Sequence, residues 1–218
     1  MTSELNLADL TPPWQEAFKL AWESLLAGSP PVGAVVMGTD GAIVARGRSR
    51  RSEPLAPPGQ LAGSRLAHAE VNALAQLPVD GTRDHVLLVT LEPCFLCVAA
   101  AAMSHVRAVE FAGIDPIWRF LQDLPSTHPA LQERWFAVDG PMPGPFGLFA
   151  SLLPLLERIE RDPSGARVDA YGLEHPALVE LARDTVGDQY LDKLRHGTLH
   201  DALRKLGPQL MELATPLG

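Results

Sequence analysis

Two short segments of this chain hold the residue types that bind transition metals and move protons. They are residues 68–70 (His-Ala-Glu) and residues 93–97 (Pro-Cys-Phe-Leu-Cys). Two thiolates and one imidazole make three zinc ligands and leave the fourth tetrahedral position open for water, as in catalytic zinc sites. A structural site normally uses four protein ligands, and the chain has only 2 cysteines. The combination therefore predicts a catalytic Zn²⁺ site with the ligands His68, Cys94 and Cys97.

Each motif taken alone has another interpretation. His-x-Glu is common at the starts of surface helices, and Cys-x-x-Cys also occurs in redox pairs and as half of a structural zinc site. Their joint presence disfavours both alternatives, because a redox pair needs no nearby His-Ala-Glu. A helix expected over residues 93–104 places Pro93 at its first position, where the missing N–H costs nothing. Cys94 and Cys97 then share one helical face at the positive end of the helix dipole, which favours their thiolates.

Glu70 is the residue that we expect to transfer protons. It lies two positions from His68, so the two side chains cannot point the same way on one helix. One can bind the ion while the other faces the water on it. Zinc lowers the pKa of bound water toward neutrality, and a neighbouring carboxylate can take up the released proton and pass it on. Glu70 is therefore predicted to be a general acid/base and not a ligand.

The spacing of apolar and turn residues predicts the elements that position these motifs. We expect helices over residues 14–26, 67–77, 93–104 and 146–158. We expect strands over residues 32–37 and 42–45, which form a hairpin, and over 85–91, 106–112 and 134–138. A long loop covers residues 52–67, and polar helical segments follow from about residue 162, including 176–184 and 188–206. This order predicts a three-layer α/β/α sandwich, with a central mixed sheet of about five strands and a C-terminal helical extension.

Composition narrows the classes of protein and partner. The chain has 218 residues, of which 46% are hydrophobic, so it can bury a core without disulfides. Its formal net charge of −8 disfavours nucleic acid as the main partner, since phosphate contacts need clustered Lys and Arg. Met1–Leu10 lacks the pattern of a secretory leader, and no apolar run reaches about 18 residues. We therefore expect a soluble, cytoplasmic protein with no membrane association.

The chain resembles the zinc-dependent cytidine/deoxycytidylate deaminase superfamily, and most of all its branch of tRNA-adenosine deaminases and bacterial guanine deaminases. The matching stretches are residues 31–36 (PVGAVV), 68–70 (HAE), 89–97 (VTLEPCFLC) and 104–116 (SHVRAVEFAGIDP). In outline the resemblance extends over about residues 14–155. It implies a cytidine-deaminase-like domain over residues 1–161, and leaves residues 162–218 as an extension without a counterpart.

The resemblance also implies residue roles. His68, Cys94 and Cys97 would hold the zinc, a zinc-bound hydroxide would attack the substrate ring, and Glu70 would shuttle the proton. The backbone N–H of Ala69 would meet a carbonyl or ring nitrogen of the substrate. The product would be ammonia and a ring that carries oxygen in place of the amine.

Two positions depart from the family pattern, and one of them is His105, which stands where an Arg is common before the fourth strand. Family members commonly place an Asn two residues after the glycine that ends the second strand, but here Ser49 stands two residues after Gly47. This departure predicts low activity on cytidine and adenosine, and better activity on a guanine-like base or a less common aminated heterocycle. We also expect Pro93 and Trp118 to contact the substrate; Trp118 would stack on a flat ring or pack in the core.

Three functions remain open at this point. A deaminase of a nucleobase, nucleoside or related small heterocycle is favoured by the acidic charge. A tRNA adenosine-to-inosine editing deaminase is supported only by four arginines within residues 46–51, which we interpret first as a solvated strand end and second as a phosphate contact. A non-catalytic binding module is disfavoured by the intact Glu70. We expect the protein to be a homodimer.

Overall fold

The computed structural model describes residues 4–187 and 190–215, and its centre is a five-stranded sheet. The strands are β1 (Gly33–Met37), β2 (Ile43–Arg48), β3 (Val86–Leu91), β4 (Ala108–Gly113) and β5 (Ala137–Asp139), in the spatial order β2-β1-β3-β4-β5. Strand β1 is antiparallel to both β2 and β3, whereas the β3–β4 and β4–β5 pairs are parallel. The expected hairpin and the mixed character of the sheet are confirmed.

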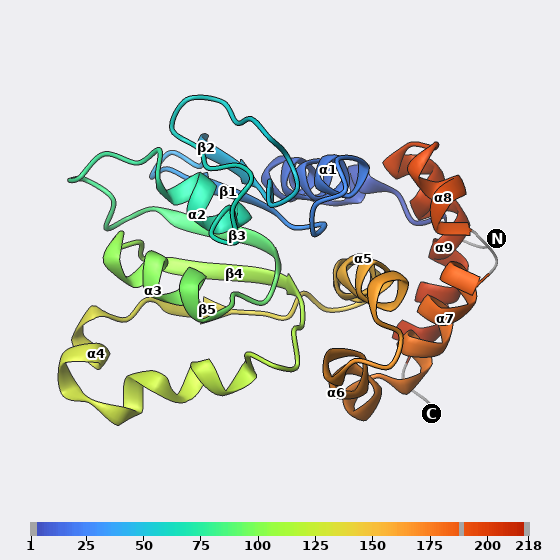
Figure 1. Ribbon diagram of the computed structural model, residues 1–218. Coiled ribbons are helices and arrows are strands. Elements are labelled where there is room, and N and C mark those ends of the chain that lie inside the picture. The colour runs from blue at the N-terminus through green and yellow to red at the C-terminus, as the bar shows by residue number, and fades with distance from the viewer. Residues whose placement is uncertain (1–3, 188–189, 216–218) are drawn as a thin grey trace.

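Helices cover both faces of this sheet (Figure 1). Helices α1 (Pro12–Leu26) and α5 (Pro145–Arg161) pack on one face, and α2 (Ala69–Leu74) and α3 (Phe95–Met103) pack on the other. Successive side chains of β1 point to opposite faces of the sheet. Val35 packs in the hydrophobic cluster beneath α1, whereas Ala34 and Val36 pack in the cluster beneath α2 and α3. The predicted three-layer α/β/α sandwich is confirmed.

Several predicted boundaries are wrong by a few residues. Helix α2 spans Ala69–Leu74 in place of 67–77, and α3 begins at Phe95, so Pro93 is not its first residue. In both cases a capping residue with extended backbone precedes the helix, and apolar spacing does not reveal where such a cap falls. Strand β5 was expected over 134–138 but begins at Ala137, because residues 119–134 form the 3-10 helix η2 (Arg119–Thr127) and α4 (Pro129–Arg134). A further short 3-10 helix, η1, covers Leu7–Asp9.

Within the described residues, α5 is followed by α6 (Ala166–Glu174), α7 (Pro176–Gly187), α8 (Tyr190–Arg195) and α9 (Leu199–Ala214). The helix expected over 188–206 is divided, because Thr198 caps α9 in a capping box with Asp201, and residues 188–189 lie outside the described part of the chain. These helices are less polar than expected, since they share one hydrophobic cluster with α1 and α5. Figure 1 shows α7, α8 and α9 grouped beyond α5. The division into domains at residue 161 falls at the end of α5 and stays a prediction.

Among the described residues, no helix has the length and apolar character needed to cross a bilayer.

Candidate metal centre and active site

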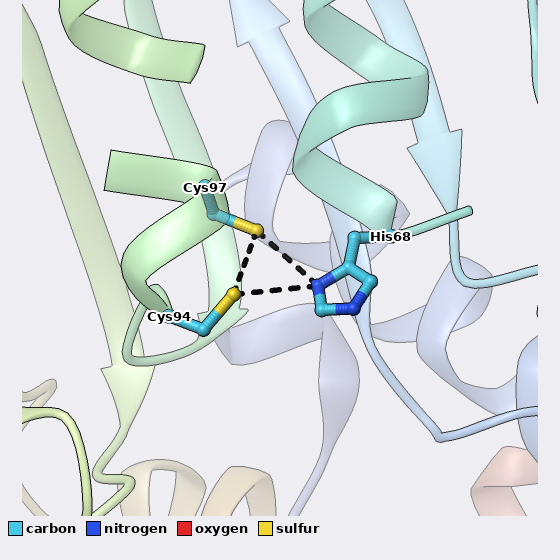
Figure 2. Close-up of side chains that lie close together, drawn as sticks. All are labelled: His68, Cys94 and Cys97. Atoms are coloured by element: carbon cyan, nitrogen blue, oxygen red, sulfur yellow. Dashed lines mark hydrogen bonds between the residues drawn. The ribbon is translucent and has the colours of Figure 1, made fainter. Parts of the chain in front are cut away.

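Three side chains predicted to bind zinc point toward one another from the starts of α2 and α3 (Figure 2). The Nδ1 atom of His68 lies 3.5 Å from Sγ of Cys94 and 3.4 Å from Sγ of Cys97, and the two sulfurs are 3.4 Å apart. Tetrahedral bonds from a zinc ion would separate such atoms by about 3.6 Å (nitrogen to sulfur) and about 3.8 Å (sulfur to sulfur). The three donors therefore fit a zinc ion after small adjustments, with the fourth position left for another ligand.

The local fold explains why these donors converge. His68 and Cys94 are the N-cap residues of α2 and α3, with extended backbones at ψ 155° and ψ 174°. The side chain of an N-cap residue folds back over the first helical turn. This brings the sulfur of Cys94 to that of Cys97, which is buried in the first turn of α3.

A glycine on the neighbouring strand fixes the position of α2. A Cβ atom built on Gly47 of β2 would overlap the backbone of α2 at Ala69 and Ala73. Strand and helix therefore meet backbone to backbone, which only glycine permits. Through this contact Gly47 places the helix that carries His68 and Glu70.

The metal-binding side chains are also coupled electrostatically. A hydrogen bond from the thiol of Cys97, together with one from His68, lowers the pKa of Cys94 to about 4 against the opposing effect of burial. Burial and the neighbouring Cys94 raise the pKa of Cys97. The hydrogen bond with Cys94 raises the pKa of His68.

Glu70 is almost completely buried, with a relative exposure of 4%. Burial raises the pKa of its carboxyl to about 7, and the charge of Cys94 adds to this increase. A carboxyl with a pKa near neutrality can both accept and release a proton under physiological conditions, which is the property required of a general acid/base.

A cavity of about 630 Å³ opens beside these residues and is lined by His68, Glu70 and Cys94. Its volume lies within the range of about 300–1,000 Å³ that is typical of small-molecule sites. Among the residues expected to contact a substrate, the structure brings Ser49, Ala69 and Trp118 to the cavity wall. Pro93 is not among the wall residues; it is buried and precedes the cap of α3.

Trp118 packs in the core, against the apolar cluster between the sheet and α3, and also borders the cavity, so stacking on a substrate ring stays a prediction. The guanidinium carbon of Arg167 lies 5.8 Å from the ring centroid, within the range of a cation–π interaction. The ring of Phe120, which is 58% exposed, is tilted by 40° against that of Trp118, with 6.4 Å between the ring centroids.

The arginines of residues 46–51 are not the solvated strand end that we expected. Arg46, which is half exposed, pairs with Glu16 at 2.8 Å. Arg48 and Arg50 are largely buried and both bind Glu53, which accepts hydrogen bonds through both carboxylate oxygens. Only Arg51, the last of the four, reaches the cavity.

Sequence reasoning missed the wall opposite the metal centre. It contains Asp115, whose carboxylate Oδ2 lies 3.6 Å from Arg158 and 3.9 Å from Arg167. Burial raises the pKa of Asp115, and these two arginines oppose the shift. The backbone N–H of Asp115 donates to buried Glu92, which also accepts from Gln122. Glu92 and Asp115 lie within stretches that resemble the family, but the sequence suggested no role for them. Gln122, Arg158 and Arg167 belong to no motif, because they come from helices far apart in the sequence.

Comparison with known proteins places these features in a family. The model of the cytidine and deoxycytidylate deaminase zinc-binding region matches residues 13–112. The tRNA-specific adenosine deaminase of Streptococcus pyogenes serotype M1 is 30% identical over 131 residues, which make up 55% of this chain and 71% of that protein. The tRNA(Ile)-lysidine synthase of Deinococcus radiodurans is 36% identical over 105 residues, or 46% of this chain, and the match spans only 17% of its own length.

A solved structure of NE0047 in complex with 2,6-diaminopurine shares the fold. It has 21% sequence identity and a TM-score of 0.50, with 72% of this chain and 85% of that chain covered. Taken with the matched zinc-binding region and the cluster of one histidine and two cysteines, these similarities show that the chain belongs to the zinc-binding cytidine and deoxycytidylate deaminase family.

Proposed function

We propose that this chain hydrolytically removes an amino group from a small heterocycle, such as a nucleobase, a nucleoside or a related ring. One observation carries the proposal: the buried carboxyl of Glu70 lines the same cavity as the metal ligands His68 and Cys94. Hydrolytic deamination needs an activated water, a group that moves protons, and a largely dry pocket for the ring. The cavity offers residues suited to each requirement.

The residues of the chain divide the reaction between them. When bound, zinc supplies the Lewis acidity that makes water nucleophilic near neutral pH. Glu70 accepts a proton from the attacking water on a carboxylate oxygen and delivers it to the adjacent ring nitrogen. Once the C–O bond has formed, Glu70 takes the second proton of the water from the hydroxyl now on the ring carbon and passes it to the amine. The C–N bond then breaks, ammonia departs, and the ring keeps a carbonyl. The N–H of Ala69, in the first turn of α2, has no acceptor within the helix and is placed to bind a ring carbonyl or nitrogen.

Two observations support a small substrate over RNA. The net charge is −8, and three of the four arginines of residues 46–51 are already paired with glutamates. Binding of a folded RNA relies on several unpaired cationic side chains along one surface. Deamination of tRNA adenosine is the second candidate, favoured by the 30% identity with a tRNA-specific adenosine deaminase.

Ammonia release from zinc-loaded protein tests the proposal. The panel contains cytosine, adenine and guanine, their nucleosides and nucleotides, pterins and tRNA, and Glu70→Gln is the inactive control. Release from a small ring that requires Glu70 supports the proposal. Inosine formation in tRNA, with no turnover of any small ring, would make the second candidate correct. Low activity on cytidine and adenosine, and a homodimeric state, stay predictions that the same preparation can check.

A further inference from the structure

Five arginines line the cavity that holds the metal centre. Arg51 and Arg65 come from the segment between β2 and α2, Arg158 and Arg161 from the last turns of α5, and Arg167 from the first turn of α6. These segments are distant in sequence. Helix α5 packs against β3 and β4, and α6 packs against α5 and donates a hydrogen bond from Tyr171 to the carbonyl of Ile114, just after β4. A neutral nucleobase does not need such a wall.

The carboxylates of the cavity neutralise this wall unevenly. Asp115 lies between Arg158 and Arg167, and Glu157 accepts a hydrogen bond from Arg161 at 2.7 Å. In the described ranges, 4–187 and 190–215, neither Arg51 nor Arg65 forms an ion pair with a carboxylate. Five carboxylates, those of Glu70, Glu92, Asp115, Glu157 and Asp162, also line the cavity, so the arginines are not in excess overall. Arg51 and Arg65 are the two cavity arginines that no carboxylate pairs within the described ranges.

Like charges are crowded around Arg51. Burial lowers the pKa of its guanidinium, and the charges of Arg161, Arg65 and Arg158 lower it further, while Glu157 partly compensates. Cations that are crowded together repel one another, and Glu157 offsets this cost in free energy only in part at Arg51. An anionic group bound between them would remove that cost, and guanidinium groups bind phosphate and carboxylate oxygens in a bidentate fashion.

Two polar atoms of the cavity wall lack partners. The hydroxyl of Ser49 is 2% exposed, and neither its Oγ atom nor Nε of Arg158 has a hydrogen-bond partner in the part of the chain that the structure describes. Native proteins leave few buried polar groups unpaired, so such atoms indicate a missing partner. The first turn of α6 adds backbone N–H groups to the same wall, at the positive end of the helix.

We propose that the substrate carries an anionic substituent, a phosphate or a carboxylate, which Arg51 and Arg65 bind while the aminated ring faces Glu70. This rests on the proposed deaminase function and specifies the substrate class of that site. The anion belongs to a small molecule and not to RNA, because the outer arginines Arg46, Arg48 and Arg50 are paired with glutamates. A cavity of about 630 Å³ accommodates a ring together with its substituent.

Calorimetric titration of the zinc-loaded protein tests this substrate class. The probes are inorganic phosphate, nucleosides paired with their 5′-monophosphates, ring carboxylates paired with their amides, and tRNA. We expect one type of anionic compound to bind at least about ten-fold more tightly than its neutral partner, since a hydrogen bond to a charged group contributes that much or more. The phosphate and carboxylate arms identify which anion is recognised.

Arginine variants locate the binding. Arg51→Ala and Arg65→Ala should each lower the affinity for the anionic compound by about 10- to 100-fold and leave the affinity for its neutral partner unchanged. Arg46→Ala, from the same arginine-rich stretch but paired outside the cavity, is the matched control and should change neither. Arg65 is exposed, so Arg65→Ala keeps the test valid if Arg51→Ala does not fold.

Equal affinity for charged and neutral partners, or equal losses in Arg46→Ala and Arg65→Ala, would overturn the proposal. So would tRNA binding that depends on Arg51 while no small anion binds. Measurement of ammonia release distinguishes a failure of the anion proposal from a failure of the proposed deaminase function. If neutral rings are deaminated and Arg51→Ala leaves kcat/KM unchanged, the anion proposal fails and the deaminase function stands. If Arg51-dependent anion binding occurs without ammonia from any ring, the deaminase function fails and the anion site stands.

Discussion

Replacing Gly47 with alanine should damage the metal centre without touching any ligand. The added Cβ would overlap the backbone of α2 at Ala69 and Ala73. Carbon atoms pack best at about 3.5–4.0 Å, so the strand and the helix must separate by roughly 1 Å. Overpacking of this kind costs about 1–3 kcal/mol, which for a domain of this size lowers the Tm by about 2–12 °C.

The same displacement should disturb the site, because α2 begins immediately after His68 and carries Glu70. A misplacement of about 1 Å in a reacting group can reduce turnover by about 100-fold. Calorimetry gives the Tm, competition with a chelator gives the zinc affinity, and the visible spectrum of the Co²⁺-substituted protein reports the coordination geometry. The last two measurements need no knowledge of the substrate.

Gly172→Ala is the matched control, since a Cβ at this position in α6 meets no other atom within 4 Å. Removal of a glycine from a helix interior gains about 1 kcal/mol, so its Tm should rise by about 2–4 °C. The two Gly→Ala changes should therefore have opposite signs. If Gly47→Ala keeps the Tm, zinc affinity and cobalt spectrum of the parent, the close contact between β2 and α2 does not position the metal ligands.

Three further predictions use simpler readouts. Glu70→Gln should retain zinc by elemental analysis but lose about 10²- to 10⁴-fold in turnover of any substrate found, because the proton carrier is gone; near-normal turnover would exclude this role. Removal of zinc by a chelator should lower the Tm, because the ion binds only the folded arrangement of His68 and the two cysteines; an unchanged Tm would mean that no ion was bound. Tyr171→Phe should cost about 1–3 kcal/mol in denaturant unfolding, because the buried carbonyl of Ile114 loses the hydroxyl that donates to it at 2.8 Å; a neutral result would show that water replaces the donor.

The metal centre could be predicted from the sequence because its information is local. His68 and Glu70 are two residues apart and the cysteines three apart, and each pair lies at a helix start. The order of strands and helices was also predictable, since β3 is an unbroken apolar run and β1 and β2 are joined by a Gly-Asp turn. Boundaries were less accurate because caps, and not apolar periodicity, determine where α2 and α3 begin.

The arginine wall could not be predicted, for the opposite reason. Arg158, Arg161 and Arg167 lie in segments whose charged residues look like the solvated face of any helix. The packing of α5 against β4 and of α6 against α5 brings these side chains to the cavity that the metal ligands also line. Conversely, the sequence suggested a solvated strand end or a phosphate contact for the arginines of residues 46–51. Most of these arginines are paired with glutamates that lie up to 30 positions away along the chain.

The cavity is lined by two separate stretches of the chain, one that carries the metal ligands and one that forms the wall facing them. Residues 68–97 supply the metal ligands and the proton carrier, whereas residues 157–168 supply the facing wall. Exchange of the second stretch between relatives would therefore change the facing wall, while the metal ligands, Glu70 and the proposed anion-binding Arg51 and Arg65 stay in place. The buried hydroxyl of Tyr171 donates a hydrogen bond to the carbonyl of Ile114, just after β4. A chimera should therefore include Tyr171 in the exchanged segment, because this bond holds α6 in position against the sheet.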